Sequence, residues 1–275
     1  MPERVQRSNR GSSDEAHIAY ILLYLPHSTR ITTVETTIRL FETMDDYRAC
    51  VALQRETWGA EFRDCVPPAI LMISQKMDGV AAGAFDAKGV LLGFVYGLMG
   101  WRDGEPCHWS HMLAVKREYR GRGIGQDLKA FQRTALLSRG VFVMYWTYDP
   151  LVARNAYLNL QKLGVDVVEY VPNMYGDDEG STTDSVIGSD RLVVRWLLRT
   201  EGRKDGRTEG LGDQPLVRLE IPADIQSLKA VAPDVAREWR SKTREAFQSY
   251  FARGYRVTRF VREPDTEQCY YVLTG

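Results

Sequence analysis

The chain has 275 residues, of which 44% are apolar and 26% are charged, and its formal net charge is zero. Such a composition is ordinary for a globular protein that buries a sizeable core. The balanced charge excludes a global field that draws the chain to nucleic acid or to an acidic membrane, so we expect neither partner. Any anion must be bound by a local site.

The cysteines and the N-terminal residues favour a cytoplasmic protein. The four cysteines are scattered and form no C-x-x-C pair, and the histidines and cysteines show no metal-ligand spacing. The apolar run Ile18–Leu25 is shorter than the ~20 residues that span a bilayer. Asp14 and Glu15 precede it and no A-x-A cleavage site follows, which argues against a signal peptide. We therefore expect a cytoplasmic location and no bound metal.

The first part of the chain is predicted to contain an extension, a strand and two helices. Residues 1–30 form an N-terminal extension that we expect to be poorly ordered. Ile31–Phe41 is rich in Thr, Val and Ile, which favour strands. Asp45 or Asp46 is the expected N-cap of a helix that ends at Gly59, and two consecutive prolines then begin a shorter helix.

A hairpin and a strand–loop–helix unit are predicted next. Residues 80–85 and 90–99 have the composition of strands that flank a tight turn at 86–89. Residues 107–115 form the next strand and lead into a glycine-rich stretch. A helix follows that stretch and ends near Gly140, and its predicted core face consists of Ile124, Leu128, Phe131 and Ala135.

The rest of the chain predicts an α+β fold with a mostly antiparallel sheet and helices on both faces. The expected elements are a strand at 141–148, a helix from Pro150 to Gly164, and strands at 165–171 and 192–198. Residues 199–214 are charged and glycine-spaced, which indicates a flexible linker. Residues 215–275 then form an α/β extension, with strands at 216–221, 257–261 and 269–273 and a helix at 233–253.

The strongest chemical signal is the stretch Arg120-Gly121-Arg122-Gly123-Ile124-Gly125 between a strand and a helix. A helix N-terminus offers free N–H groups and a favourable dipole to a phosphate, and glycine lets the backbone approach closely. A simple turn and a solvated basic loop are the competing interpretations. The stretch is not a Walker motif, because no Gly-Lys-Ser/Thr follows, and the preceding hairpin argues against a Rossmann unit.

The residues from His111 to Gly125 resemble motif A of the GNAT acyltransferases, whose signature is Q/R-x-x-G-x-G/A, with Arg120, Gly123 and Gly125 in the fixed positions. The predicted order of elements over residues 31–198 is similar to that of the family, and the segment that begins at Arg154-Asn155-Ala156 resembles its second cofactor segment. Within the family, the chain looks most like a bacterial subgroup of predicted acetyltransferases that carry a C-terminal extension.

The resemblance implies a GNAT fold in which the fourth strand splays away from the fifth and an acyl-CoA, acetyl-CoA or a longer one, enters the gap. It implies that Leu113, Ala114 and Val115 bind the pantetheine arm through their backbone, and that Asn155 contacts the same arm. The pyrophosphate is expected on the backbone amides of the glycine-rich stretch, so its expected binding residues are Arg120, Gly121, Arg122, Gly123, Ile124 and Gly125.

His111 is the expected general base, since histidine titrates near neutrality and some members of the family carry a histidine at this position. Alternation along the strand predicts that His111, Leu113 and Val115 share one face. A hydrogen-bonded core histidine is the competing interpretation. His108, which should point to the other face, and Glu105 are weaker alternatives.

The sequence offers two tyrosines as candidates for the general acid. The family's usual tyrosine position holds Leu160 here, so the chain departs from the pattern. Tyr157, one turn earlier, and Tyr175, in a later loop, are the candidates, although Tyr157 also suits core packing. The CoA thiolate can also leave unaided.

We expect direct transfer to a primary amine of a small molecule or an amino acid. The aromatic residues Tyr145, Trp146 and Tyr148 either line the acceptor cleft or pack in the sheet. An acidic loop at residues 177–179 either attracts a cationic amine or is solvated. A non-catalytic acyl-CoA sensor is the alternative function, and a nicotinamide oxidoreductase is a distant third.

The C-terminal helix has one apolar face that must be covered. Its residues recur at intervals of three or four, so they lie on one side of the helix. We expect this face to dock within the chain, as a lid or a wall of the acceptor cleft, with a homodimer contact as the alternative. The face consists of Ala236, Trp239, Thr243, Phe247 and Phe251.

Overall fold

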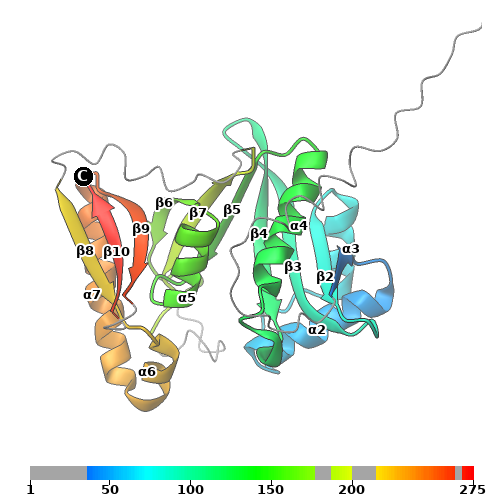
Figure 1. The fold of residues 1–275 in the computed structure, drawn as a ribbon, viewed down its shortest axis with the longest axis horizontal. Coiled ribbons are helices and arrows are strands. Elements are labelled where there is room, and N and C mark those ends of the chain that lie inside the picture. Colours follow the sequence, from blue (N-terminus) through cyan, green and yellow to red (C-terminus); the bar gives the residue numbers. More distant parts are fainter. Residues whose placement is uncertain (1–35, 177–186, 200–214, 264–267) are drawn as a thin grey trace, which may run out of the picture. The chain divides into compact units, whose positions relative to one another are not determined.

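The computed structural model describes residues 36–176, 187–199, 215–263 and 268–275. The predicted N-terminal extension, most of the predicted linker and the acidic loop at 177–179 lie outside these residues. Within them, the predicted α+β class is confirmed, since a mixed sheet is flanked by helices and a second, smaller sheet follows (Figure 1).

The larger sheet has seven strands in the order β1-β2-β3-β4-β5-β7-β6. Neighbouring strands run antiparallel, apart from β4 and β5, which run parallel. The strands are β1 (Thr37–Leu40), β2 (Val80–Phe85), β3 (Leu91–Arg102), β4 (Glu105–Val115), β5 (Val143–Tyr148), β6 (Asp166–Val171) and β7 (Arg191–Leu197).

Helices cover both faces of this sheet. Helices α2 (Met44–Trp58) and α3 (Pro68–Lys76) pack on one face, around a cluster that includes Phe94 and Tyr96. Helix α4 (Ile124–Ser138) packs on the other face, around a larger cluster that includes Leu128. Since both faces of the first part of β3 are covered, residues 91–97 are buried at every position rather than at alternate ones.

Two helix starts differ from the prediction. Thr43 caps α2, because its hydroxyl accepts a hydrogen bond from the amide of Asp46, whose carboxylate accepts one from the amide of Thr43. The helix expected from Pro150 begins only at Ala153, since the carboxylate of Asp149 holds residues 149–152 in a turn. It comprises α5 (Ala153–Ala156) and a π-helix (Tyr157–Lys162).

The C-terminal residues form a three-stranded sheet in the order β8-β10-β9, beside β6 (Figure 1). Its strands are β8 (Leu216–Ile221), β9 (Arg256–Arg262) and β10 (Cys269–Thr274), and its helices are α6 (Ile225–Val231) and α7 (Pro233–Ala252). Helix α6 was not predicted; Asp224 caps it by accepting hydrogen bonds from two backbone amides.

The apolar face of α7 is covered within the chain. Phe247 is fully buried and stacks on Tyr170 of β6, with 5.2 Å between the ring centroids. Polar contacts accompany this packing: the hydroxyl of Tyr271 donates to the carbonyl of Pro150 over 2.7 Å. The C-terminal segment thus contacts the end of β5 and the edge of the larger sheet.

Two arginines of α7 bind carboxylates that belong to the larger sheet. Arg240 contacts Asp149 at 2.7 Å, and the side chains are only 3% and 9% exposed. Arg244 contacts Asp190 at 2.6 Å. Burial alone raises the pKa of Asp190, but hydrogen bonds from Arg244 and Tyr170 outweigh it and hold the pKa below its usual value.

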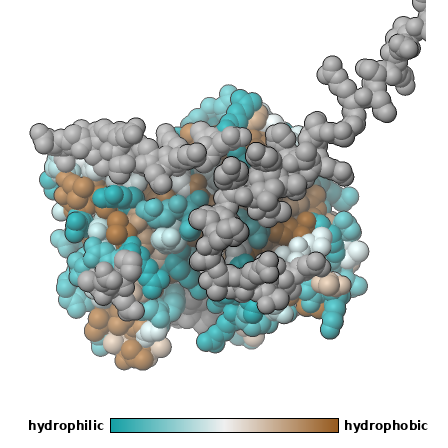
Figure 2. Space-filling model, in the orientation of Figure 1, coloured by the Kyte–Doolittle hydropathy of each residue, from teal (hydrophilic) through white to brown (hydrophobic). Residues whose placement is uncertain are grey.

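The surface of the described part of the chain is mixed in polarity. Figure 2 shows hydrophobic residues gathered over α6 and the start of α7, where Val231 is 78% exposed. Among the described residues, no helix has both the length and the apolar character needed to cross a bilayer.

Candidate active site

A cavity opens where β4 and β5 separate. The two strands pair only at His108 with Met144 and at Trp109 with Tyr145, and beyond these residues they diverge (Figure 1). The cavity between them has a volume of about 1770 Å³. The predicted separation of these two strands is therefore confirmed.

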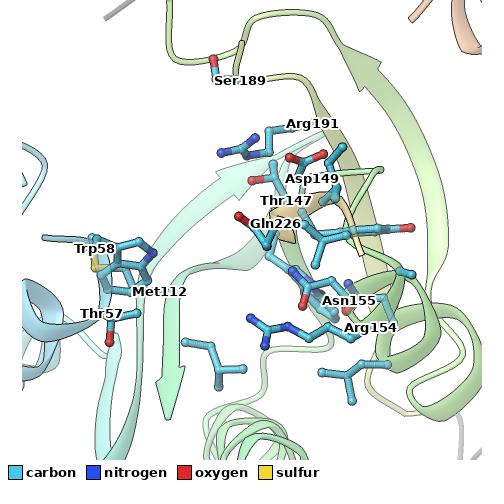
Figure 3. Close-up of a pocket in the computed structure, with 18 of the residues that line it drawn as sticks. Thr57, Trp58, Met112, Thr147, Asp149, Arg154, Asn155, Ser189, Arg191 and Gln226 are labelled. Atoms are coloured by element: carbon cyan, nitrogen blue, oxygen red, sulfur yellow. Dashed lines mark hydrogen bonds between the residues drawn. The ribbon is translucent and has the colours of Figure 1, made fainter. Parts of the chain in front are cut away.

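The cavity has two walls. Figure 3 shows Trp58 and Met112 on one side, from α2 and β4, and Thr147, Arg154 and Arg191 on the other. The second wall continues into the C-terminal segment, since residues 223–226 and Arg262 also line the cavity. The C-terminal segment therefore forms part of the site.

The glycine-rich stretch, here called the cradle, lies at the start of α4; its residue Arg120 lines the cavity, whereas residues 121–125 are not among the lining residues. The backbone is left-handed at Gly121 and Gly123, with φ of 78° and 88°, which residues other than glycine rarely adopt. No side chain caps the helix. Within the described residues, the backbone amides from Gly121 to Gly125 have no hydrogen-bond acceptor. The N-terminus of α4 thus presents several free donors and the positive end of its dipole.

Cations surround this cradle. Arg117, Arg120 and Arg154 line the cavity, and the side chain of Arg120 is fixed by a 2.9 Å hydrogen bond to the carbonyl of Val115. Burial, followed by the charges of Arg154 and Arg117, lowers the pKa of Arg120. Positive charges that destabilise one another in this way attract a polyanion. The guanidinium of Arg122 lies 5.1 Å from the ring of Tyr119.

The backbone of Leu113, Ala114 and Val115 has one free edge. These residues pair with β3 on one side, whereas the pairing with β5 on the other side ends at Trp109. Leu113 lines the cavity. Asn155 of α5 lines it as well, whereas Ala114 and Val115, also predicted for the cofactor arm, are not among the lining residues.

A β-bulge in β4 places His111. Tyr96 and Gly97 are neighbours on β3, yet they pair with Met112 and Ser110, so His111 is the extra residue between them. The bulge reverses the alternation of side chains along the strand at this position.

The prediction that His111 shares a face with Leu113 and Val115 is wrong because of this bulge. Leu113 and Val115 pack against the cluster under α4. The ring of His111 instead lies edge-on to the ring of Tyr96, in the cluster under α2 and α3, at 6.1 Å between centroids.

His111 remains accessible from the cavity, which it lines. The surrounding protein atoms reduce the solvation of the imidazole, which lowers the pKa of His111 below the usual 6.5. The nearby charge of Asp64 opposes this shift only in part. The imidazole is therefore neutral at pH 7 and has a free lone pair.

His108 has a different environment. Its side chain is fully buried, and Nε2 lies 3.0 Å from the amide nitrogen of Gln132. Burial, together with the charges of Lys129 and Arg139, lowers the pKa of His108 to about 3. His108 is thus a neutral core residue on the α4 face, and it was expected on the face opposite to Leu113.

A buried lysine at the cavity was missed by sequence reasoning. Lys129 of α4 is 3% exposed, and its Nζ donates to the hydroxyl of Ser110 at 2.7 Å and to Oε1 of Gln132 at 3.3 Å. The ammonium also lies 3.9 Å from the centroid of the Trp146 ring. Lys129, Ser110 and Trp146 all line the cavity.

The burial of Lys129 follows from the orientation of α4. The predicted core face included Phe131 and Ala135, but these are only partly buried. The buried residues of α4 that recur at intervals of four are Ile124, Leu128, Gln132 and Leu136. Lys129 is buried on the same side of the helix. The four-residue spacing of Ile124, Leu128 and Leu136 marks the buried side of α4, but a lysine in a helix normally faces water, so the sequence alone does not show that Lys129 is buried.

The two candidate tyrosines differ in position. Tyr175 lines the cavity, with its hydroxyl 3.2 Å from that of Thr147. Tyr157 is 39% exposed on the π-helix and is not one of the cavity-lining residues. Leu160, at the family's tyrosine position, is buried in the core.

The aromatic residues of β5 are buried, and two of the three line the cavity. Tyr145, Trp146 and Tyr148 are all buried, and the indole N–H of Trp146 donates to Asn159 over 3.0 Å. Trp146 and Tyr148 also line the cavity, so both interpretations of these residues hold in part.

Residues 47–159 match the model of the acetyltransferase (GNAT) family. The chain carries a GNAT-family acetyltransferase domain. This match confirms the resemblance seen in the glycine-rich stretch. The GNAT-matching region holds the cradle, His111, Lys129 and Asn155, whereas Tyr175 and the C-terminal wall of the cavity lie outside it.

Comparison with solved structures gives the following similarities. Aminoglycoside 6′-acetyltransferase type Ii is 21% identical over 60% of this chain and 99% of its own, with a TM-score of 0.47. The ribosomal-protein-S18-alanine N-acetyltransferase of Escherichia coli is 18% identical over 62% of this chain and 97% of its own, with a TM-score of 0.45. Comparison with the curated proteins gave no match.

Proposed function

We propose that the chain is an acyl-CoA-dependent N-acyltransferase that transfers an acyl group, most simply acetyl, to a primary amine of a small molecule or an amino acid. The observation that carries this proposal is the row of free backbone amides from Gly121 to Gly125 beside Arg120 and Arg154. Free amides at a helix N-terminus, within a field of cations, suit a diphosphate.

The separated strands support binding of the rest of the cofactor. The free edge of Leu113, Ala114 and Val115 offers backbone donors and acceptors to an extended pantetheine arm, as an added strand would use them. Asn155 reaches the same arm from α5. We propose residues 31–198 as the acyltransferase domain and residues 215–275 as an extension that completes one wall of its cavity.

We propose His111 as the general base. An amine must lose a proton to attack a thioester, and His111 lines the cavity in its neutral form at pH 7. Direct attack with both substrates bound needs no covalent enzyme intermediate. Tyr175 is a candidate proton donor for the departing thiolate because it lies at the cavity. Tyr157 lies outside the cavity, and the thiolate can also leave unaided.

One observation favours a second function, an acyl-CoA sensor without catalysis. Leu160 stands where the family's proton-donating tyrosine is expected, and its side chain is buried. A sensor would keep the cradle and the cofactor cleft and lose turnover.

Thiol release from acetyl-CoA in the presence of amino acids and other primary amines separates these functions. An acyltransferase gives saturable release with at least one amine, and His111→Ala lowers kcat by about 100-fold or more, as expected for a lost general base. A sensor binds acetyl-CoA in calorimetry without releasing thiol with any amine. Absence of acetyl-CoA binding would refute both functions.

A further inference from the structure

Lys129 is a buried amino group without an anionic partner. In the part of the chain that the structure describes, no carboxylate forms an ion pair with it, and its contacts are the neutral groups of Ser110, Gln132 and Trp146. Buried lysines are costly unless an anion compensates the charge. An unpaired ammonium at the cavity can therefore stabilise a negative charge on a bound molecule.

The amino group lies at the point where β4 and β5 separate. Ser110 and Trp146 directly follow Trp109 and Tyr145, the last paired residues of the two strands, and Nζ of Lys129 contacts both of them. The proposed pantetheine arm runs along β4 toward this point. A thioester at the end of that arm therefore comes close to Lys129.

The surroundings of Lys129 allow it to release a proton near neutrality. Burial lowers the pKa of Lys129 from the usual 10.5 to about 7. The titratable side chain that faces it from β4 is His108, which is neutral; Gln132 of α4 and Met144 of β5 are uncharged. No other ionisable group among the described contacts of Lys129 competes for the proton.

We propose that Lys129 is the catalytic acid of the transfer and donates a proton to the CoA sulfur as the thioester breaks. This inference rests on the proposed function. The amine nitrogen bonds to the carbonyl carbon, the carbon–sulfur bond breaks, and its electron pair goes to sulfur, which takes a proton from Nζ. The attacking nitrogen gives up one proton to His111, and solvent returns the proton that Lys129 has lost.

Lys129 fits this role better than Tyr175. The hydroxyl of Tyr175 contacts Thr147, which lies two residues beyond the last β5 residue that pairs with β4. Lys129 contacts residues directly at the point of separation. It also takes the place of the proton donor that Leu160 cannot supply.

Lys129→Met tests the role, because methionine is of similar length and uncharged. We expect kcat to fall about 100-fold or more while the affinity for acetyl-CoA stays within a few-fold. The alkaline decline of kcat near pH 7, caused by loss of the Lys129 proton, should vanish. Lys242→Met, at an exposed position of α7, is the matched control and should retain kcat, whereas Tyr175→Phe tests the competing proton donor. Unchanged kcat in Lys129→Met, or a large loss only in Tyr175→Phe, would overturn the proposal.

Stability separates catalysis from a structural role. Since Lys129→Met removes a buried, unpaired charge, its thermal midpoint at pH 7 should equal or exceed that of the wild type. A lysine that serves only the core would instead give a lower midpoint together with weaker acetyl-CoA binding.

A measurement without turnover gives an independent answer. The ultraviolet absorbance of the thiolate reports the pKa of the thiol of bound CoA. While Lys129 carries its proton, the ammonium stabilises the thiolate, so thiolate absorbance should begin at a lower pH in the wild type than in Lys129→Met. Equal thiol pKa values in the two proteins would refute the role of Lys129 alone, whereas failure of wild-type protein to bind CoA would refute the proposed function.

Discussion

Replacing Gly123 by alanine perturbs the proposed diphosphate cradle, and replacing Gly89 by alanine provides a matched control. Both glycines have a left-handed backbone, with φ of 88° and 79°. An added Cβ meets nothing within 4 Å at Gly89, and at Gly123 it meets only a carboxylate oxygen of Asp127 at 3.9 Å. Neither substitution causes a steric clash, so each costs mainly the left-handed backbone strain, about 1–2 kcal/mol.

The two variants should therefore lose similar stability and differ in cofactor binding. Gly123 directly precedes the free amides of Ile124 and Gly125. Any relaxation of its φ turns these amides away from a common target, and a methyl group stands in the path of the phosphate. We expect the affinity of Gly123→Ala for CoA to fall at least about tenfold, equivalent to ~1.4 kcal/mol, and that of Gly89→Ala to stay unchanged.

Urea denaturation gives the stability of each variant, and isothermal titration calorimetry gives the CoA affinity. Alanine is preferable to valine at Gly123, because a β-branched residue at positive φ adds strain that the control does not share. Wild-type affinity in Gly123→Ala, or an equal loss of affinity in Gly89→Ala, would show that the amides at the start of α4 do not hold the cofactor.

Two further predictions concern stability. Arg240→Met leaves the buried carboxylate of Asp149 without its arginine and should lower the free energy of unfolding by about 3–5 kcal/mol. Arg237→Met, in a surface pair with Asp234, should lower it by less than about 0.5 kcal/mol. Equal losses in urea denaturation would show that the buried Arg240–Asp149 pair does not stabilise the fold. Arg39 and two backbone amides lower the pKa of Asp46 from 3.8 to about 2, so its contribution of about 2 kcal/mol is present above pH 4 and is lost as the pH falls to 2. The stability difference between wild type and Asp46→Asn should therefore shrink over that range, and a constant difference would exclude the linkage.

The sequence predicted the secondary-structure elements correctly where the local residue pattern and the tertiary packing agree. The hairpin of β2 and β3, the strand before the glycine-rich stretch and the amphipathic α4 follow from period and turn residues alone. The left-handed glycines of the cradle follow from the same signals. These features depend on residues close together in the chain.

Features set by pairing between distant residues were not predictable. The bulge at His111 is visible only in the register between β4 and β3, and it reverses the face of one catalytic candidate. The burial of Lys129 depends on how α4 is rotated against the sheet, and a lysine in a helix normally faces water. The contribution of residues 223–226 to the cavity depends on docking of the C-terminal segment.

The two arginine anchors of α7 have a consequence for synthesis on the ribosome. Asp149 and Asp190 emerge long before Arg240 and Arg244, so the nascent acyltransferase domain carries two carboxylates whose arginine partners do not yet exist. Until about residue 250 has left the exit tunnel, these carboxylates lack the arginines that neutralise them in the folded protein. Cotranslational folding of the sheet should therefore remain incomplete until the C-terminal segment has been synthesised. Any binding of acyl-CoA to the incomplete nascent chain is delayed as well.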